Sequence, residues 1–244
     1  MPSLRGGLFL AMYEVLIIGA GFSGAEAAYW LAQAGVRVGL MTQSLDSVMM
    51  PFLPPEPPFP EGSLLQKVWR SGMSLWAFHA EAKYALESLP TLHLFQATAT
   101  GLLLSESGLA GVQTWEGPPI PAPRVALAVG SFLGARLSIG GVEEEAGRIS
   151  EASYPDLLEA LLALGFRFVQ REAVAEETPT TPGYRVRYHA FHPEEWEEET
   201  FRLKRLPGLY ALGLCVREGD YRLMAQEGER FAQYLLRELG KGAV

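Results

Sequence analysis

The first apolar positions of the chain form two short runs on either side of an alanine-rich segment. The largely apolar run 13–18 ends at Gly19 and predicts a strand buried on both faces. Residues 24–34 predict a helix that ends at Gly35, the residue type that most often follows a helix C-terminus. A second apolar run, 36–41, predicts another strand. Together these segments form a βαβ unit of about 30 residues.

A proline-rich stretch interrupts this pattern at residues 49–62. It holds six prolines between Pro51 and Pro60, so neither a helix nor a central strand is expected there. Helical spacing resumes with Ser63 as the candidate N-cap and continues to Leu89. The sequence therefore predicts an ordered loop followed by one long helix.

The rest of the chain alternates short apolar runs with turn residues. Strands are predicted at 92–95, 101–104, 111–115, 124–129, 166–170, 184–191 and 209–214. Helices are predicted at 154–164 and 221–239. The first three of these strands suggest a small antiparallel meander. The acidic run 194–199 predicts a solvated face.

The order of these elements predicts an α/β fold. We expect a Rossmann-like fold with a parallel central sheet, a small antiparallel β-meander and a reduced insertion. Residues 12–140 and 203–244 are expected to form one discontinuous Rossmann-like domain, with 141–202 as a small inserted subdomain. The N-terminal and C-terminal parts of the chain would then meet across one sheet.

Length and composition agree with one large domain: the chain has 244 residues, of which 48% are hydrophobic. The net charge of −8 argues against non-specific binding of nucleic acid, which needs clustered lysine and arginine. The single cysteine, Cys215, allows no internal disulfide and no Cys/His zinc cluster, so we expect a cytoplasmic protein without a metal. No apolar stretch reaches the roughly 20 residues that span a bilayer. Met12 is a candidate start, which leaves open whether residues 1–11 belong to the native protein.

Three glycines at the first turn carry the clearest chemical signal. Gly19, Gly21 and Gly24 form the pattern Gly-x-Gly-x-x-Gly between the first strand and the helix. The first permits the tight turn, the second clears space for a pyrophosphate, and the third lets helix and strand pack closely. The helix N-terminus would add free N–H groups and a positive dipole end. The pattern predicts a dinucleotide site, with a turn that serves only packing as the alternative.

Thr42 stands where this motif usually carries an acidic residue that binds the ribose hydroxyls. Thr42 and Gln43 can accept hydrogen bonds from hydroxyl groups, but without charge. The missing charge weakens a generic NAD interpretation. It leaves FAD open, because the larger contact area of FAD spreads its binding over more groups.

Four segments, in order, resemble the MnmG/GidA flavoproteins, which modify wobble uridines of tRNA. They are VLIIGAGFSGAEAA…GLMTQSLD near the start, VALAVGSFLGARLSIGG at 125–141, ETPTTPGYRV at 177–186 and LYALGLCVREGDYRLMAQEG at 209–228. That family has the same glycine pattern, a glutamate two residues later (Glu26 here) and threonine at the acid position. The resemblance therefore implies FAD as the cofactor and makes Thr42 a shared feature.

The resemblance also implies which residues contact FAD. The residues expected at the pyrophosphate are Gly19, Gly21, Phe22, Ser23 and Gly24, and those at the adenosine ribose are Thr42 and Gln43. The adenine would lie at Ala97, Thr98 and Ala99, and Gly130 and Ser131 would end a strand beside the cofactor. The ribityl or flavin end would lie close to Gly213, Leu214 and Tyr221. The segment 97–99 would reach the adenine through backbone groups. The helix that begins near Tyr221 would direct its dipole toward the isoalloxazine ring.

Several family features are not found in the sequence. The cysteine-containing segment SCNPAIGG is replaced by MMPFLPPEPPFPEG, and the long insertion and helical domain that serve tRNA binding are missing. We expect an oxidoreductase in which FAD takes hydride from a donor such as NADH or NADPH, with catalytic residues unknown. The alternative is a non-catalytic FAD-binding module, or a subunit acting with a partner chain in tRNA modification. tRNA binding is expected only with a partner protein, and a homo-oligomer is left open.

Other candidate groups have competing interpretations. Cys215 is either a thiol near the flavin or a small buried residue, and the absence of a partner cysteine favours the second. His189 and His192 are either acid–base groups or loop histidines, and Arg136 and Arg217 either bind an anion or lie on the surface.

The proline-rich segment is either an apolar lid over the isoalloxazine or a packed surface loop; its apolar residues are Met49, Met50, Phe52 and Leu53. Four aromatic residues at helical spacing are expected in the core or an interface: Tyr29, Trp30, Trp69 and Trp76.

Overall fold

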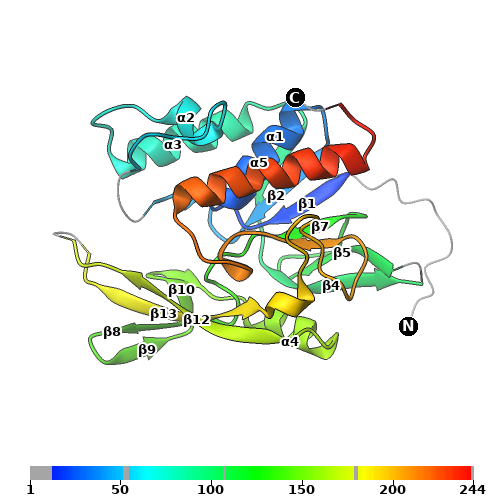
Figure 1. The fold of residues 1–244 in the computed structure, drawn as a ribbon. Coiled ribbons are helices and arrows are strands. Elements are labelled where there is room, and N and C mark those ends of the chain that lie inside the picture. Colours follow the sequence, from blue (N-terminus) through cyan, green and yellow to red (C-terminus); the bar gives the residue numbers. More distant parts are fainter. Residues whose placement is uncertain (1–12, 52–54, 107, 179–180, 243–244) are drawn as a thin grey trace.

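The computed structural model describes residues 13–51, 55–106, 108–178 and 181–242. Its centre is a five-stranded parallel sheet in the order β14–β7–β1–β2–β3 (Figure 1). The strands are β1 (Val15–Ile18), β2 (Val38–Thr42), β3 (Leu92–Gln96), β7 (Val125–Leu127) and β14 (Leu209–Ala211). The N-terminal and C-terminal parts of the chain meet in this sheet, as predicted.

Four helices lie on one face of the parallel sheet (Figure 1): α1 (Phe22–Gln33), α2 (Leu64–Val68), α3 (Leu75–Glu87) and α5 (Tyr221–Glu238). Alternate side chains of β1 divide between two cores. Val15 and Ile17 pack with these helices, whereas Leu16 and Ile18 pack on the other face, where α4 (Pro155–Ala163) lies. All four side chains are fully buried, which explains why the strand is apolar at every position.

Three antiparallel sheets complete the described part of the fold. The meander consists of β4 (Ala99–Ser105), β5 (Gly108–Thr114) and β6 (Ile120–Pro121). A four-stranded sheet runs in the order β12 (Phe168–Ala175), β13 (Tyr184–Phe191), β8 (Arg136–Ile139) and β9 (Val142–Glu144). A short pair is formed by β10 (Ala146–Arg148) and β11 (Glu151–Ala152). The predicted fold class is confirmed. The domain boundary at residue 141 stays a prediction, and β8, which precedes it, belongs to the four-stranded sheet.

The single helix predicted over 63–89 is two helices, so that prediction was wrong. Ser63 caps α2 as predicted, but α2 has only five residues. The chain then bends through Gly72, whose φ of 76° suits glycine. Ser74 caps α3 by accepting the Ala77 N–H at 3.1 Å. Both helices bury apolar residues in the same core, which is why the helical spacing continues across the break.

The strand predicted at 92–95 does not belong to the meander, which corrects the sequence interpretation. β3 pairs with β2 in parallel, with Val38 opposite Leu92 and Thr42 opposite Gln96. Parallel neighbours need a crossover connection, and the segment containing α2 and α3 supplies it.

The acidic run 194–199 lies largely at the surface, except for Glu195, which is buried in the 3₁₀ helix η1 (Pro193–Glu195). The Glu195 carboxylate accepts hydrogen bonds from Arg205 Nη2 at 2.7 Å and from Arg167 Nε at 2.8 Å. These guanidinium groups, Arg205 foremost, outweigh burial and lower the pKa of Glu195 to about 2. The prediction of a solvated face was wrong for this one residue.

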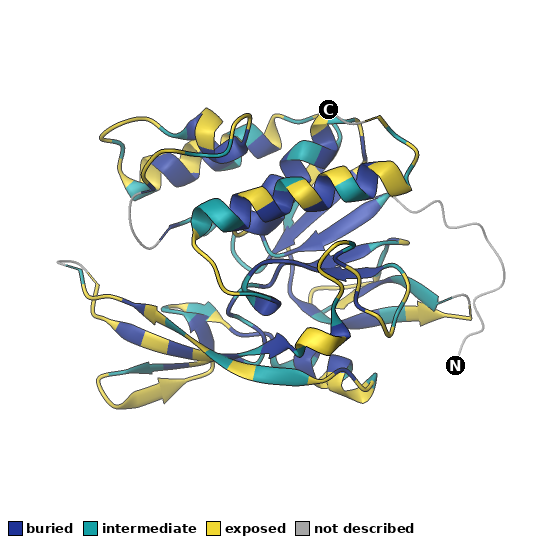
Figure 2. Ribbon diagram, in the orientation of Figure 1, coloured by how far each residue is buried: buried dark blue, intermediate teal, exposed yellow. Residues whose placement is uncertain are grey.

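Burial follows the layers of the fold (Figure 2). The strands β1, β2, β7 and β14, nearly all of α1 and the inner face of α5 are buried, while the outward face of α5 is exposed. Trp76, which we expected in the core or an interface, is 67% exposed on α3. Among the described residues, no helix combines the length and the apolar character needed to cross a bilayer.

Candidate functional site

The predicted cofactor segments all follow the carboxyl ends of the parallel strands. Gly19 follows β1, Thr42 ends β2, and Ala97 follows β3. Gly130 lies beyond β7, and Gly213 lies beyond β14 in the 3₁₀ helix η2 (Gly213–Cys215). In open α/β sheets, ligands bind outside this edge. The fold thus gathers at one edge residues that are far apart in the sequence.

The three glycines of the first turn have different surroundings. A Cβ added to Gly19, which has a φ of 106°, would lie 2.2 Å from the Ala128 carbonyl oxygen. A Cβ added to Gly24 would lie 2.0 Å from the Gly19 carbonyl oxygen. A Cβ added to Gly21 would meet no atom within 4 Å. The first and third glycines are therefore required by packing, and the second faces open space.

The amino end of α1 presents hydrogen-bond donors beside this open space. Its first helical bond runs from Ala25 N to the Gly21 carbonyl oxygen, so the preceding amides are those a helix leaves without internal partners. In the described structure no side chain caps this end, and its first turn carries no acidic residue. The Ser23 hydroxyl is buried and has no hydrogen-bond partner among the described residues. These features fit the diphosphate of a dinucleotide.

The two residues expected at the adenosine ribose already make local contacts. The Thr42 side chain is buried, and its hydroxyl donates to the Ser44 carbonyl oxygen at 3.1 Å. The Gln43 amide nitrogen donates to the Ser153 carbonyl oxygen at 3.2 Å. This leaves the Gln43 amide oxygen as the acceptor suited to a ribose hydroxyl.

Thr98, in the segment expected at the adenine, has both backbone groups engaged. Its N–H donates to the two carboxylate oxygens of Glu116 at 3.0 and 2.9 Å. Its carbonyl oxygen accepts from Trp115 N at 3.2 Å. An adenine ring could use the Thr98 N–H only after Glu116 moves away. No pattern in the sequence singles out Glu116.

Gly130 and Ser131 form the turn beyond β7. Gly130 has a φ of 58°, and the buried Ser131 hydroxyl donates to the Gly147 carbonyl oxygen at 3.5 Å. The contact between this turn and β10 therefore links the parallel sheet to the smaller sheets. Leu214, which lies beyond β14, is partly buried and packs against the core of the four-stranded sheet.

Gly213 meets both α1 and α5. Its N–H donates to Glu227 Oε2 at 2.6 Å. A Cβ added to Gly213, which has a φ of 81°, would lie 3.0 Å from Ser23 Oγ. The turn after β14 therefore lies directly against the first turn of α1, and the structure brings these predicted residues together.

Tyr221 at the start of α5 joins the glycine turn to the proline-rich loop. Its ring lies 5.9 Å from that of Phe22, and its hydroxyl is hydrogen-bonded to both backbone groups of Glu56. The Trp69 indole nitrogen donates to the Pro55 carbonyl oxygen at 2.8 Å. The described part of this loop is thus ordered by specific contacts.

The start of the proline-rich segment is held from the opposite side. Arg148 donates to the Met50 carbonyl oxygen at 2.9 Å and to the Pro51 carbonyl oxygen at 3.4 Å. Phe52 and Leu53, which we assigned to a possible lid, lie outside the described residues. The lid interpretation therefore stays a prediction.

The structure clarifies the remaining candidate groups. Burial raises the pKa of the Cys215 thiol to about 12, and its sulfur donates to the Leu127 and Leu212 carbonyl oxygens. Cys215 is thus a buried thiol, not a thiolate, which agrees with the interpretation we favoured. His192 Nδ1 accepts the Glu194 N–H, whereas Arg136 is exposed and pairs with Glu145. The buried Nδ1 atom of His189 has no partner in the described structure.

Glu26 forms a buried link between α1 and α2. Its two carboxylate oxygens accept the N–H groups of Leu64 and Leu65 at 2.9 and 2.8 Å. Burial raises the pKa of Glu26 to about 7, although the two hydrogen bonds act in the opposite direction. Glu26 thus fixes the helix that follows the proline-rich loop.

Glu227 was not among the residues predicted from the sequence, although its position in the helical pattern carries a signal. Glu227 falls at helical spacing between Met224 and Phe231, both of which are buried on α5. A carboxylate at a core-facing position needs a partner or a raised pKa. Glu227 has both: it accepts the Gly213 N–H, and burial raises its pKa to about 7.

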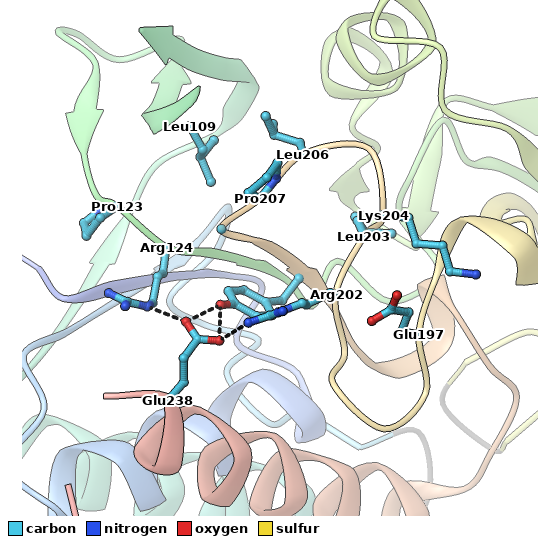
Figure 3. Close-up of a pocket in the computed structure, with 12 residues that line it drawn as sticks. Leu109, Pro123, Arg124, Glu197, Arg202, Leu203, Lys204, Leu206, Pro207 and Glu238 are labelled. Atoms are coloured by element: carbon cyan, nitrogen blue, oxygen red, sulfur yellow. Dashed lines mark hydrogen bonds and ion pairs between the residues drawn. The ribbon is translucent and has the colours of Figure 1, made fainter. Parts of the chain in front are cut away.

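A separate pocket of about 540 Å³ lies at the opposite edge of the sheet (Figure 3). Arg124 precedes β7 and Gly208 precedes β14, so this pocket is at the amino ends of the strands. Figure 3 shows the Glu238 carboxylate between Arg124 and Arg202, at 3.1 and 2.8 Å. Burial opposes its ionisation, but Arg202 and Tyr210 lower the pKa of Glu238 to about 2. This pocket is not the cofactor site, because it faces away from the glycine turn.

The fold and the glycine-turn site together define a dinucleotide-binding α/β protein of the flavoprotein type. The sequence pattern of the family described as "Glucose inhibited division protein A" matches residues 14–54 and 67–173. The chain belongs to this family. Family and fold together imply FAD as the cofactor.

Individual relatives agree with this assignment. The crystal structure of the GidA-related protein from Thermus thermophilus is 70% identical, with a TM-score of 0.88, and the match covers 93% of this chain and 100% of that one. Aquifex aeolicus GidA shares the fold at a TM-score of 0.80 and 13% identity, covering 98% of this chain and 66% of its own. The "tRNA uridine 5-carboxymethylaminomethyl modification enzyme MnmG" of Synechocystis sp. is 27% identical over an alignment 235 residues long, which covers 78% of this chain and 37% of that enzyme. The chain thus spans about a third of the length of the curated relatives it matches.

Proposed function

We propose that this chain is an FAD-dependent oxidoreductase that holds FAD along the carboxyl edge of its parallel sheet. The amino end of α1 carries the proposal: Gly21 faces open space, and the buried Ser23 hydroxyl has no partner in the described structure. A diphosphate placed there would accept hydrogen bonds from the free amide N–H groups and from the Ser23 hydroxyl. The adenosine would extend toward Gln43, and the flavin toward Gly213 and Tyr221.

FAD would supply the redox chemistry, because a flavin accepts and passes on hydride. The chain's own groups would bind and orient it. Helix α5 has 18 residues and begins beside Phe22, so its positive end would favour negative charge at the flavin end of the site. The proline-rich loop, fixed by Tyr221 and Trp69, would exclude water from the same side.

The electron donor in this proposal is NADH or NADPH, and the proposed location is the cytoplasm. The test is to reconstitute the purified protein with FAD and then add each donor without oxygen. The oxidoreductase function predicts that the visible absorption of the bound flavin bleaches with at least one donor. A tightly bound flavin that neither donor reduces would argue for the second candidate.

The second candidate is a non-catalytic FAD-binding module, or a subunit that joins a partner chain in tRNA modification. One observation favours it. The cysteine of the chain, Cys215, is a buried thiol with a pKa near 12. Co-purification of a partner chain, and tRNA binding only in its presence, would support this candidate.

The proposal also includes a division into two parts: one domain of residues 12–140 with 203–244, and an inserted subdomain of residues 141–202. It further includes the formation of a homo-oligomer.

A further inference from the structure

Glu227 lies where α5 crosses the first turn of α1. A Cβ added to the next residue, Gly228, would lie 2.5 Å from the Ser23 carbonyl oxygen, so the two helices touch without intervening side chains. Glu227 is only 1% exposed. Its Oε1 atom has no hydrogen-bond partner within the described part of the chain. A buried carboxylate oxygen without a partner is costly and calls for an explanation.

The other oxygen of Glu227 controls the turn beyond β14. Oε2 accepts the Gly213 N–H at 2.6 Å, and Gly213 in turn lies against the Ser23 side chain. Two buried polar atoms without described partners, Ser23 Oγ and Glu227 Oε1, therefore belong to residues on either side of one glycine. One of them is in the helix turn proposed to hold the diphosphate.

The charged and titratable groups around Glu227 shift its pKa in both directions. The nearest cation is Arg217, whose Nη1 lies 4.0 Å from Glu227 Oε1 and 3.0 Å from Glu198 Oε1. The groups that face Glu227 or its immediate neighbours are Arg217, Arg230, Glu198, Cys215 and, across the helix contact, Glu26. Burial dominates and raises the pKa of Glu227 to about 7, against the Gly213 N–H and the Arg217 charge. Both protonation states are thus accessible at neutral pH.

We infer that Glu227 is a positioning residue of the cofactor site and that its protonation is coupled to binding of the cofactor diphosphate. The inference rests on the proposed function. Protonated Glu227 still accepts the Gly213 N–H through its carbonyl oxygen and keeps the turn in place. Ionised Glu227 adds a buried negative charge beside the anion and weakens binding. Cofactor binding above neutral pH therefore takes up one proton from solvent, and no other bond changes.

The test is a titration of the protein with FAD, followed by fluorescence, from pH 6 to pH 9. Linkage predicts that the association constant is flat below pH 7 and falls by up to about tenfold per pH unit above it. Glu227→Gln removes the charge, and its affinity should be independent of pH. Glu229→Gln is the matched control, because Glu229 is on the same helix and accepts from Gln233 instead. Glu229→Gln should keep the wild-type pH dependence of FAD affinity. If Glu227 had a purely structural role, the affinity of the wild-type protein would not depend on pH in this way.

Calorimetry of the wild-type protein in two buffers of different ionisation enthalpy counts the protons bound with FAD without any variant. Uptake that approaches one proton per FAD near pH 8 supports the inference. FAD binding with pH-independent affinity and no proton uptake contradicts it and leaves the proposed function intact. The inference is also contradicted if the FAD affinity still depends on pH in Glu227→Gln but no longer does in Glu26→Gln, because Glu26 would then be the coupled group. A folded chain that takes up no FAD contradicts the proposed function and this inference together.

Discussion

The Tyr221 hydroxyl accepts the Glu56 N–H at 2.7 Å and donates to the Glu56 carbonyl oxygen at 3.1 Å. One side chain at the start of α5 thus fixes the backbone of the proline-rich loop. The same ring contacts Phe22 in the first turn of α1. The loop, the glycine turn and the last helix are therefore joined at one residue.

Tyr221→Phe should release the loop while keeping the ring contact with Phe22. Losing both hydrogen bonds is expected to cost about 1 kcal/mol of unfolding free energy. Limited proteolysis between Pro55 and Gly62 should be faster than in the wild type. Tyr234→Phe is the matched control, since its hydroxyl on the same helix bonds Glu238 and not the loop. Equal cleavage rates in the two variants would show that Tyr221 does not hold the loop.

Two glycines of the first turn allow packing and ligand binding to be tested separately. Gly24→Ala places a Cβ 2.0 Å from the Gly19 carbonyl oxygen, so it should lower the thermal stability of the free protein and its FAD affinity. Gly21→Ala meets no atom of the protein within 4 Å and should leave the stability unchanged. It should still weaken FAD binding by at least about tenfold, or 1.4 kcal/mol, if the diphosphate lies against it.

Gly117→Ala, where an added Cβ also meets no atom within 4 Å, is the control for these two variants. It should change neither stability nor binding. The assignment of Gly21 to the diphosphate fails if Gly21→Ala and Gly117→Ala bind FAD equally well.

The stability of the fold should pass through a maximum near pH 5. Glu26 and Glu227 have pKa values raised from 4.5 to about 7, so their contribution is complete below 4.5 and is lost as the pH rises through 7. Glu195 and Glu238 have pKa values lowered to about 2, so their contribution is lost as the pH falls from 4.5 toward 2. The loss between pH 5 and 8 should amount to a few kcal/mol, measured by denaturant unfolding. A protein that is more stable at pH 8 than at pH 5 would show that the two buried glutamates are not protonated in the fold.

Glu195 and Glu194 allow a comparison of adjacent carboxylates that share one partner, Arg167. Glu195 is buried and also pairs with Arg205, whereas Glu194 is exposed. Glu195→Gln should cost about 2 kcal/mol and lower the Tm by about 4–8 °C, because charged hydrogen bonds to a buried group are lost. Glu194→Gln should cost less than about 0.5 kcal/mol. Similar Tm changes in the two variants would mean that burial of Glu195 adds nothing.

Local pattern was sufficient to predict the β1–α1–β2 unit. An apolar run, spaced glycines and a second apolar run depend on neighbours in sequence, and the structure places the turn accordingly. The pattern could not tell that the strand at 92–95 pairs with β2, because parallel pairing depends on a crossover far along the chain. It also could not detect the break at Gly72, because α2 and α3 bury their apolar sides in one core.

The site was predictable where it depends on backbone geometry and not where it depends on tertiary partners. Gly19 is required by its own φ of 106°, and Gly24 by its close approach to the Gly19 carbonyl oxygen, so both depend on the turn itself. Glu227 and Glu116 are engaged by amides 14 and 18 residues away, at Gly213 and Thr98. Their roles follow from the fold and not from the spacing of their neighbours.

The decisive experiment for the cofactor site is FAD binding by the purified chain. The protein, cleared of any bound nucleotide, is titrated with FAD while flavin fluorescence and the visible spectrum are recorded. We expect saturable uptake of one FAD per chain, with a bound-flavin spectrum that survives gel filtration. A folded protein that takes up no FAD at concentrations well above its own would contradict the assignment of the cofactor site.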